Sequence, residues 1–147
     1  LVGSGGERTV RARDYYEAAY MTAREDDEIL AAITFAAPTG GYAYEKQKRK
    51  IGDNATAACA ALVAMEGGRC TSASIAMTNL SDVPVWSEAA GQALVGTRCD
   101  ADAIGAAVEA ATADIDPTED NRGPVDFKRH VASVMIRRAI ERAVSRA

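Results

Sequence analysis

The stretch that decides the fold is "NATAACAALVAMEGGRCTSASIAMTNL", residues 54–80. Its first half is rich in alanine, which favours a helix. The "EGG" at 66–68, however, is typical of a hairpin turn, and the residues after it alternate between polar and apolar. Ala73, Ile75 and Met77 would share one side of such a strand, with serines and threonines on the other. We therefore predict a pair of strands in a sheet that has one face in water.

Further strand signals precede this pair. We expect a short strand in "ERTVRA" (7–12), a longer one in "EILAAITFAAP" (28–38), and another that begins at Gly41 in "GYAYEKQKRK". Residues 28–80 are thus predicted to form an antiparallel meander. The glycines of "GSGG" (3–6) indicate a turn rather than a phosphate-binding loop, because no helix follows them.

The pattern changes to helical after the meander. Helices are predicted at 86–95, 100–113 and 124–147. The last predicted helix has an apolar face and, opposite it, a basic face. The basic face could contact a partner or simply be solvated. The apolar residues are Ala132, Ile136, Ala139, Ile140 and Ala143, and the basic residues are Arg137, Arg138 and Arg142. Strands followed by helices indicate an α+β fold, an antiparallel meander followed by a three-helix bundle, in a single domain over 1–147.

The composition is that of an ordinary globular protein. The chain has 147 residues, 48% of them hydrophobic, and a formal net charge of −4, which argues against a general nucleic-acid binder. No apolar run approaches the roughly 18 residues of a membrane span. We expect a soluble, cytoplasmic protein. Because the first residue is Leu1 and not methionine, we also expect the chain to come from a longer polypeptide.

No catalytic or metal site can be recognised in the residues. His130 is the single histidine, and Cys59, Cys70 and Cys99 are too far apart in the sequence to form a metal-ligand pattern. We interpret the three cysteines as small buried residues. Without a second histidine there is no obvious base to activate a serine, cysteine or threonine. Catalysis by this chain alone is therefore not expected.

Two groups of residues allow two interpretations each. The cations of "KQKRK" (46–50) could be a solvated strand end that resists aggregation, or they could face an anion or a partner, with Asp53 offsetting part of their charge. Tyr15, Tyr16 and Tyr20 could belong to the core or could cover a planar cofactor. The residue types alone leave both questions open.

Four stretches, taken in order, carry a resemblance to a known family. They are "ERTVRARDYYEAAYMTAREDDEIL", "YEKQKRKIGD", "AMEGGRCTSASIAMTNLSDVPVW" and "EDNRGPVDFKRHVASVMIRRAIERA". Together they resemble the C-terminal domain of the flavoprotein (medium) subunit of molybdenum hydroxylases, and the similarity is greatest to aerobic carbon monoxide dehydrogenase. Each stretch is weak alone, but their order and spacing span nearly the whole chain.

The resemblance implies part of an oxidoreductase subunit that is not catalytic alone. Such a subunit carries FAD and assembles with an iron–sulfur small subunit and a molybdopterin large subunit. Electrons pass from the molybdenum centre through two [2Fe-2S] clusters to FAD and on to an external acceptor. The family's FAD pyrophosphate and adenosine are held by an N-terminal FAD-binding domain, which we expect to be absent from this chain.

The resemblance also suggests four cofactor-binding residues. Tyr20 is similar to a tyrosine that covers one ring face, Leu30 to an apolar residue that contacts the isoalloxazine, and Lys46 to a lysine near its polar edge. Asp53 lies in a segment that corresponds to a loop near the flavin. The alternative is a structural module that docks subunits together without direct flavin contact.

Overall fold

The computed structural model describes residues 1–147 and divides into two compact units. Unit 1 comprises Leu1–Ala37 and unit 2 comprises Pro38–Ala147. Most of the regular secondary structure belongs to unit 2, which contains a four-stranded sheet and three helices. No helix of the chain is both long enough and apolar enough to cross a membrane.

The sheet of unit 2 is an antiparallel meander of β5 (Gly41–Gln47), β6 (Ala57–Glu66), β7 (Arg69–Thr78) and β8 (Val85–Ser87). The interpretation of the alanine-rich stretch as a strand is confirmed, because β6 pairs with a neighbour along both of its edges. Gly67 and Gly68 form the hairpin turn with φ of 56° and 75°, where a side chain would be strained.

Two boundaries predicted from the sequence are wrong in this region. Trp86 was placed in the first helix, but it lies in β8, opposite Ala76 of β7. The helix α1 begins only at Glu88, where the Ser87 hydroxyl accepts a hydrogen bond from the Ala90 amide at 3.1 Å. The meander also begins at Gly41 rather than at residue 28.

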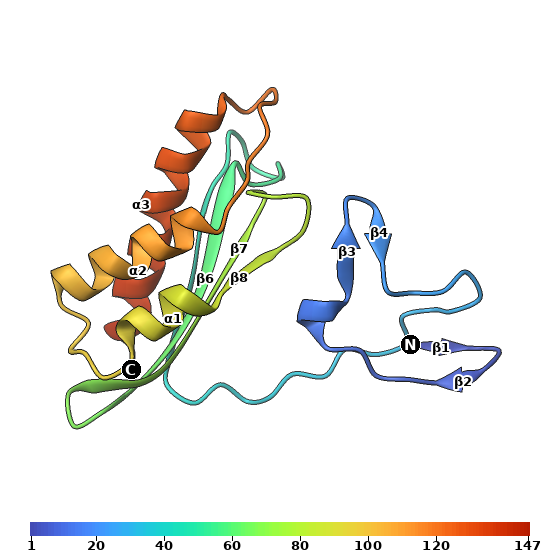
Figure 1. Cartoon of the computed structure of the whole chain (residues 1–147), viewed down its shortest axis with the longest axis horizontal. Helices are drawn as coiled ribbons and strands as arrows, with labels where there is room; N and C mark the ends of the chain where they lie inside the picture. The colour runs from blue at the N-terminus through green and yellow to red at the C-terminus, as the bar shows by residue number, and fades with distance from the viewer. The chain divides into compact units, whose positions relative to one another are not determined.

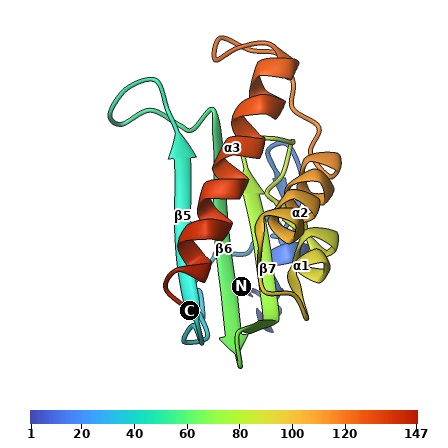
Figure 2. The same ribbon diagram turned by 90° about the vertical axis from the view of Figure 1, so that its left-hand side faces the viewer.

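The three predicted helices are confirmed as α1 (Glu88–Leu94), α2 (Ala101–Ala113) and α3 (Val125–Val144). All three cover the same face of the sheet (Figures 1 and 2). Helix α3 packs on β5 and β6, α1 packs on β7, and α2 packs against both other helices. The apolar face predicted for α3 is buried, whereas its arginines Arg137, Arg138 and Arg142 are exposed.

The core between sheet and helices consists of small and aliphatic side chains. Strand β6 contributes Ala57, Cys59, Ala61 and Val63, and no aromatic side chain of the chain is buried. All three cysteines are free and buried, as predicted. The small residues let α3 approach the sheet closely: a Cβ added to Gly41 would lie 1.9 Å from the Ala143 carbonyl oxygen. The start of β5 therefore lies directly under the last turn of α3.

The opposite face of the sheet in unit 2 carries no helix (Figures 1 and 2). We call it the open face. Because successive side chains of a strand alternate, it displays the residues that point away from the helices. It includes the exposed side chains of Tyr42, Tyr44, Lys46, Leu62 and Trp86.

Unit 1 contains only short elements. Strands β1 (Val2–Gly3) and β2 (Gly6–Glu7) form one hairpin, and β3 (Tyr16–Ala18) and β4 (Met21–Thr22) form another, preceded by a 3-10 turn at Ala12–Asp14. The strand predicted over 7–12 is therefore wrong, because only Glu7 belongs to a strand.

The strand predicted over 28–38 is also wrong. Only Ile29 pairs, through a single bridge to Val2. The alternation is present, but the segment has no neighbouring strand to accept its hydrogen bonds along its length. Its large apolar side chains, Ile29, Leu30, Ile33 and Phe35, are between 48% and 83% exposed.

Candidate functional site

The four residues predicted to contact a cofactor are divided between the two units. Tyr20 and Leu30 belong to unit 1, and Lys46 and Asp53 belong to unit 2. Within unit 1, Tyr20 is fully exposed at the turn between β3 and β4, where its φ is 62°. Leu30 is about half exposed and lines a cavity.

The cavity in unit 1 has a volume of about 350 Å³, which lies in the range of small-molecule sites. The extended segment that contains Leu30 and Ile33 forms one part of its lining, and Tyr15 and Tyr16 form another. The two tyrosine rings meet edge to face with their centroids 5.1 Å apart. These tyrosines, rather than Tyr20, are the aromatic residues of the cavity. The signal in the sequence was the tyrosine cluster, for which both a core position and contact with a planar cofactor were left open.

An ion pair fixes the chain two residues before Leu30. The Glu28 carboxylate is buried and accepts hydrogen bonds from Arg8 Nε at 2.6 Å and Arg8 Nη2 at 2.7 Å. The Glu25 amide donates to the same carboxylate at 2.8 Å. Arg8 and then the Glu25 amide lower the pKa of Glu28 to about 2. Because Arg8 also lines the cavity, this pair connects the cavity wall to the Leu30 segment.

Glu28 is expected to titrate with a pKa of about 2 rather than near its ordinary 4.5. A lowered carboxyl pKa stabilises the folded form above pH 4.5, and this contribution is lost as the pH falls towards 2. Replacement of Arg8 by glutamine should raise the pKa of Glu28 towards its ordinary value. A carbon-13 NMR titration of the Glu28 carboxyl group measures both values. A midpoint near 4.5 in the unchanged protein would contradict the ion pair.

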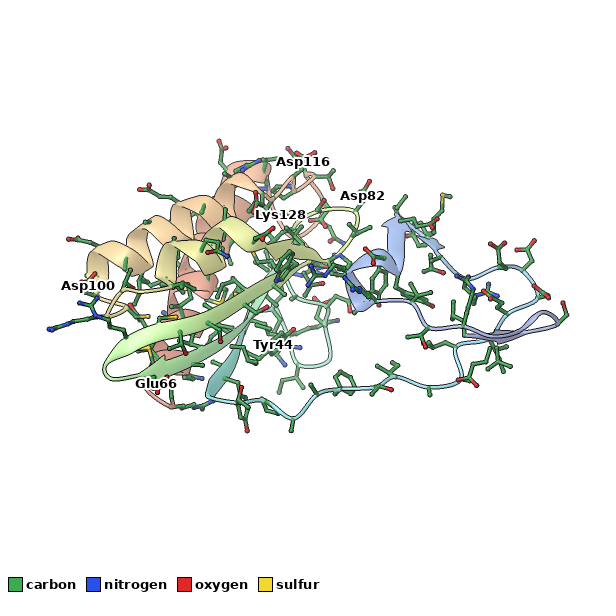
Figure 3. All side chains as sticks on the ribbon, turned by 60° about the horizontal axis from the view of Figure 1, so that its bottom comes forward. Tyr44, Glu66, Asp82, Asp100, Asp116 and Lys128 are labelled. Atoms are coloured by element: carbon green, nitrogen blue, oxygen red, sulfur yellow. The ribbon has the colours of Figure 1, made fainter.

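Lys46 lies at the penultimate position of β5, opposite Ala58 of β6. Its side chain is exposed on the open face, on the same side of the strand as Tyr44, which Figure 3 labels. No carboxylate forms an ion pair with the Lys46 ammonium group, in contrast to Arg49 of the same basic run. Lys46 therefore presents an unneutralised cation at the end of an edge strand.

Asp53 lies in the loop between β5 and β6 and is mostly buried, with 13% of its side chain exposed. Its carboxylate pairs with Arg49 Nε at 3.3 Å and with Arg122 Nη2 at 3.5 Å. Burial alone would raise the pKa of Asp53, but Arg49 and Arg122 outweigh burial, so the pKa lies below its ordinary value. The expectation that Asp53 offsets part of the basic run is confirmed for Arg49. Nothing in the local sequence pattern indicated the contact with Arg122.

Comparisons with known proteins agree with this architecture. The family model described as "CO dehydrogenase flavoprotein C-terminal domain" matches residues 42–143, which lie within unit 2. The carbon monoxide dehydrogenase medium chain of Afipia carboxidovorans is 53% identical over all of this chain and 52% of that protein. The medium chain of Hydrogenophaga pseudoflava is 39% identical over 99% of this chain and 52% of that protein. The chain thus spans about half the length of these curated relatives.

Solved structures give the same result. The structure of a Cu,Mo-CO dehydrogenase in its cyanide-inactivated form contains a chain that matches with a TM-score of 0.96 and 53% identity, over 99% of this chain and 52% of that one. Quinoline 2-oxidoreductase from Pseudomonas putida 86 matches with a TM-score of 0.91 and 30% identity, over 98% of this chain and 50% of that one. The α+β fold and the family resemblance read from the four sequence stretches are both confirmed. The chain belongs to the family of CO dehydrogenase flavoprotein C-terminal domains.

Proposed function

We propose that this chain is part of the FAD-carrying electron-transfer subunit of a molybdenum hydroxylase complex similar to carbon monoxide dehydrogenase. The observation that carries the proposal is the 53% identity to a carbon monoxide dehydrogenase medium chain along the entire chain. In this proposal an iron–sulfur small subunit with [2Fe-2S] clusters and a molybdopterin large subunit are the partners. The chain belongs to an oxidoreductase without being catalytic alone. Its cytoplasmic location stays a prediction.

The residues of the chain fit the ring end of FAD better than its phosphate end. When bound, FAD supplies reversible uptake and release of electrons, which no side chain provides. The cavity wall formed by Leu30, Tyr15 and Tyr16 offers apolar and aromatic surface of the kind that receives a planar ring. Tyr20 is exposed at the β3–β4 turn and is retained as a candidate for one ring face.

Phosphate binding belongs elsewhere in the proposal. The glycine-rich "GSGG" segment leads into the short strand β2 and not into a helix, so it lacks the helix N-terminus that cradles phosphates. We therefore assign the pyrophosphate and adenosine to an N-terminal FAD-binding domain outside this chain. The relatives' roughly twofold greater length is consistent with such a domain.

Lys46 has an electrostatic role in this proposal. A cation near the polar edge of the ring favours the form of the flavin that carries more negative charge, which is the reduced form. The ammonium group of Lys46 is available for this because it is exposed and has no carboxylate partner. Asp53 acts differently, since its charge is already neutralised by Arg49 and Arg122.

The test is Lys46→Gln in the complete subunit assembled with its partners. Loss of the cation should lower the two-electron midpoint potential of the flavin by about 20–40 mV and slow its reoxidation. Lys50→Gln is the matched control, because it removes the same charge from the exposed loop. A spectroelectrochemical titration gives the potentials. Equal shifts in both variants, or a complete subunit without flavin absorbance, would refute the proposal.

A second candidate is a docking module that joins subunits without touching the flavin. The open face favours it, because Tyr42, Tyr44, Leu62 and Trp86 are between 38% and 57% exposed. To separate the two, FAD binding by the N-terminal half is measured with and without this chain. Tighter binding or a changed flavin spectrum in its presence supports direct contact. No change supports docking alone.

A further inference from the structure

A chain of ion pairs connects two loops of unit 2. It runs from Lys128 to Asp120 (2.8 Å), from Asp120 to Arg122 (3.4 Å), from Arg122 to Asp53 (3.5 Å) and from Asp53 to Arg49 (3.3 Å). We call these five residues the clamp. It joins the α2–α3 loop (114–124) to the β5–β6 loop (48–56), and both loops lie at the same end of the sheet (Figures 1 and 2).

The α2–α3 loop forms the fixed side of the clamp. Lys128 in the first turn of α3 is only 3% exposed, and its ammonium group also donates to the Thr118 carbonyl at 2.6 Å. It lies at the end of unit 2 that carries Asp116 and Asp82, away from Glu66 and Asp100 (Figure 3). Lys128 and the Arg122 amide, which donates to Asp120 at 2.8 Å, lower the pKa of Asp120 to about 2.

Arg122 connects this fixed side to the other loop. Its side chain is 19% exposed, and its guanidinium contacts both Asp120 and Asp53. The Arg122 Nε is buried and has no hydrogen-bond acceptor. The carboxylates of Asp120 and Asp53 thus hold the side chain in place although one of its donors is unsatisfied. Arg49 adds a second connection, since its Nη1 donates to the Asn121 carbonyl at 3.2 Å.

On the other side of the clamp, the β5–β6 loop follows the end of the edge strand β5. Strand β5 pairs only with β6, and its ladder ends at Gln47 opposite Ala57, followed by one more bond from the Thr56 amide to the Gln47 carbonyl at 2.7 Å. Lys46 is one residue from that end. Strand ends with few further contacts open easily, and a frayed end would let Lys46 move.

We propose that Arg122 is a positioning residue. It holds the β5–β6 loop against the α2–α3 loop and thereby fixes Lys46 at the end of β5. The effect on the loop follows from the contacts of unit 2 alone. The effect on the flavin rests on the function proposed above, because it requires Lys46 to act on the ring. The two parts are therefore tested by separate measurements on the complete, FAD-loaded subunit.

The loop is tested by limited proteolysis with trypsin, which cleaves after Lys48, Arg49 and Lys50. In Arg122→Leu the β5–β6 loop loses the Arg122–Asp53 ion pair that joins it to the α2–α3 loop, so cleavage at these bonds should accelerate about fivefold. Arg122→Lys, which keeps the charge, should restore part of the protection. Arg137→Leu, which removes an exposed arginine of α3, should leave the rate unchanged. If Arg122→Leu and Arg137→Leu are cleaved alike, the clamp does not hold the loop.

The action through Lys46 is tested by a double-mutant cycle on the flavin midpoint potential. Arg122→Leu should lower the potential by about half of the Lys46→Gln shift, and it should add nothing in the Lys46→Gln background. Additive shifts would show that Arg122 acts on the flavin independently, which overturns the positioning role. If Lys46→Gln itself shifts nothing while cleavage still accelerates, the loop part stands and the proposed function of Lys46 fails.

Discussion

Replacing Gly41 by alanine is expected to destabilise unit 2 by at least about 3 kcal/mol. The added Cβ would lie 1.9 Å from the Ala143 carbonyl oxygen and 2.6 Å from the Ala147 nitrogen, and both are backbone atoms that cannot turn away. The start of β5 would have to separate from the end of α3. Urea unfolding followed by far-ultraviolet circular dichroism measures the loss.

The control for this prediction is Gly105→Ala in α2. Apart from the two chain neighbours and the helix's own backbone, no atom lies within 4 Å of a Cβ at Gly105, and the residue is inside a helix, where alanine is preferred over glycine. This variant should gain about 0.5–1 kcal/mol. The same substitution thus has opposite signs at the two sites. An unchanged urea midpoint for Gly41→Ala would show that α3 does not lie as close to β5 as described.

The second large effect is expected from Ile136→Ala, at about 3–4 kcal/mol. Ile136 is fully buried where α3 faces the sheet, and its truncation removes three buried carbon atoms and leaves a cavity that the packed neighbours fill only in part. Thermal and urea unfolding report the change.

Leu62→Ala is the matched comparison for Ile136→Ala. Leu62 lies on the open face of β6 and is 41% exposed, so its truncation should cost less than about 1 kcal/mol in this chain. If the two substitutions destabilise the chain equally, the Leu62 side chain would have to be as buried as that of Ile136. That outcome is incompatible with the fold in Figures 1 and 2.

The sequence predicted correctly those parts of the fold in which a periodic pattern of apolar residues extends over many neighbouring positions. Strand β7, Arg69–Thr78, follows the predicted turn directly, because alternating residues come after an unambiguous turn signal. The helices are displaced by at most a few residues for the same reason. Strand β8 was missed because Val85–Ser87 is too short to show any period. The segment 28–38 failed differently, since its alternation is genuine but a strand also requires a partner.

The candidate site shows the same division between local and distant information. The pairing of Asp53 with Arg49 could be read from a spacing of four residues, whereas Arg122 is 69 residues away and is brought there by the return of the chain after α2. Tyr20 was selected by resemblance, but the cavity is lined by Tyr15 and Tyr16. Which tyrosine of a cluster faces a cavity depends on the path of the backbone, which the cluster itself does not determine.

The absence of aromatic residues from the core has a practical consequence. The single tryptophan, Trp86, lies on the open face, 38% exposed, with its indole nitrogen donating to Ser74 Oγ at 3.1 Å. Its emission therefore reports the polarity of whatever approaches that face and not the integrity of the interior. A partner surface that covers β7 and β8 would shift the Trp86 emission to shorter wavelength. A nearby yellow chromophore would quench the emission by energy transfer. Trp86 fluorescence can therefore be used to follow assembly without an added label.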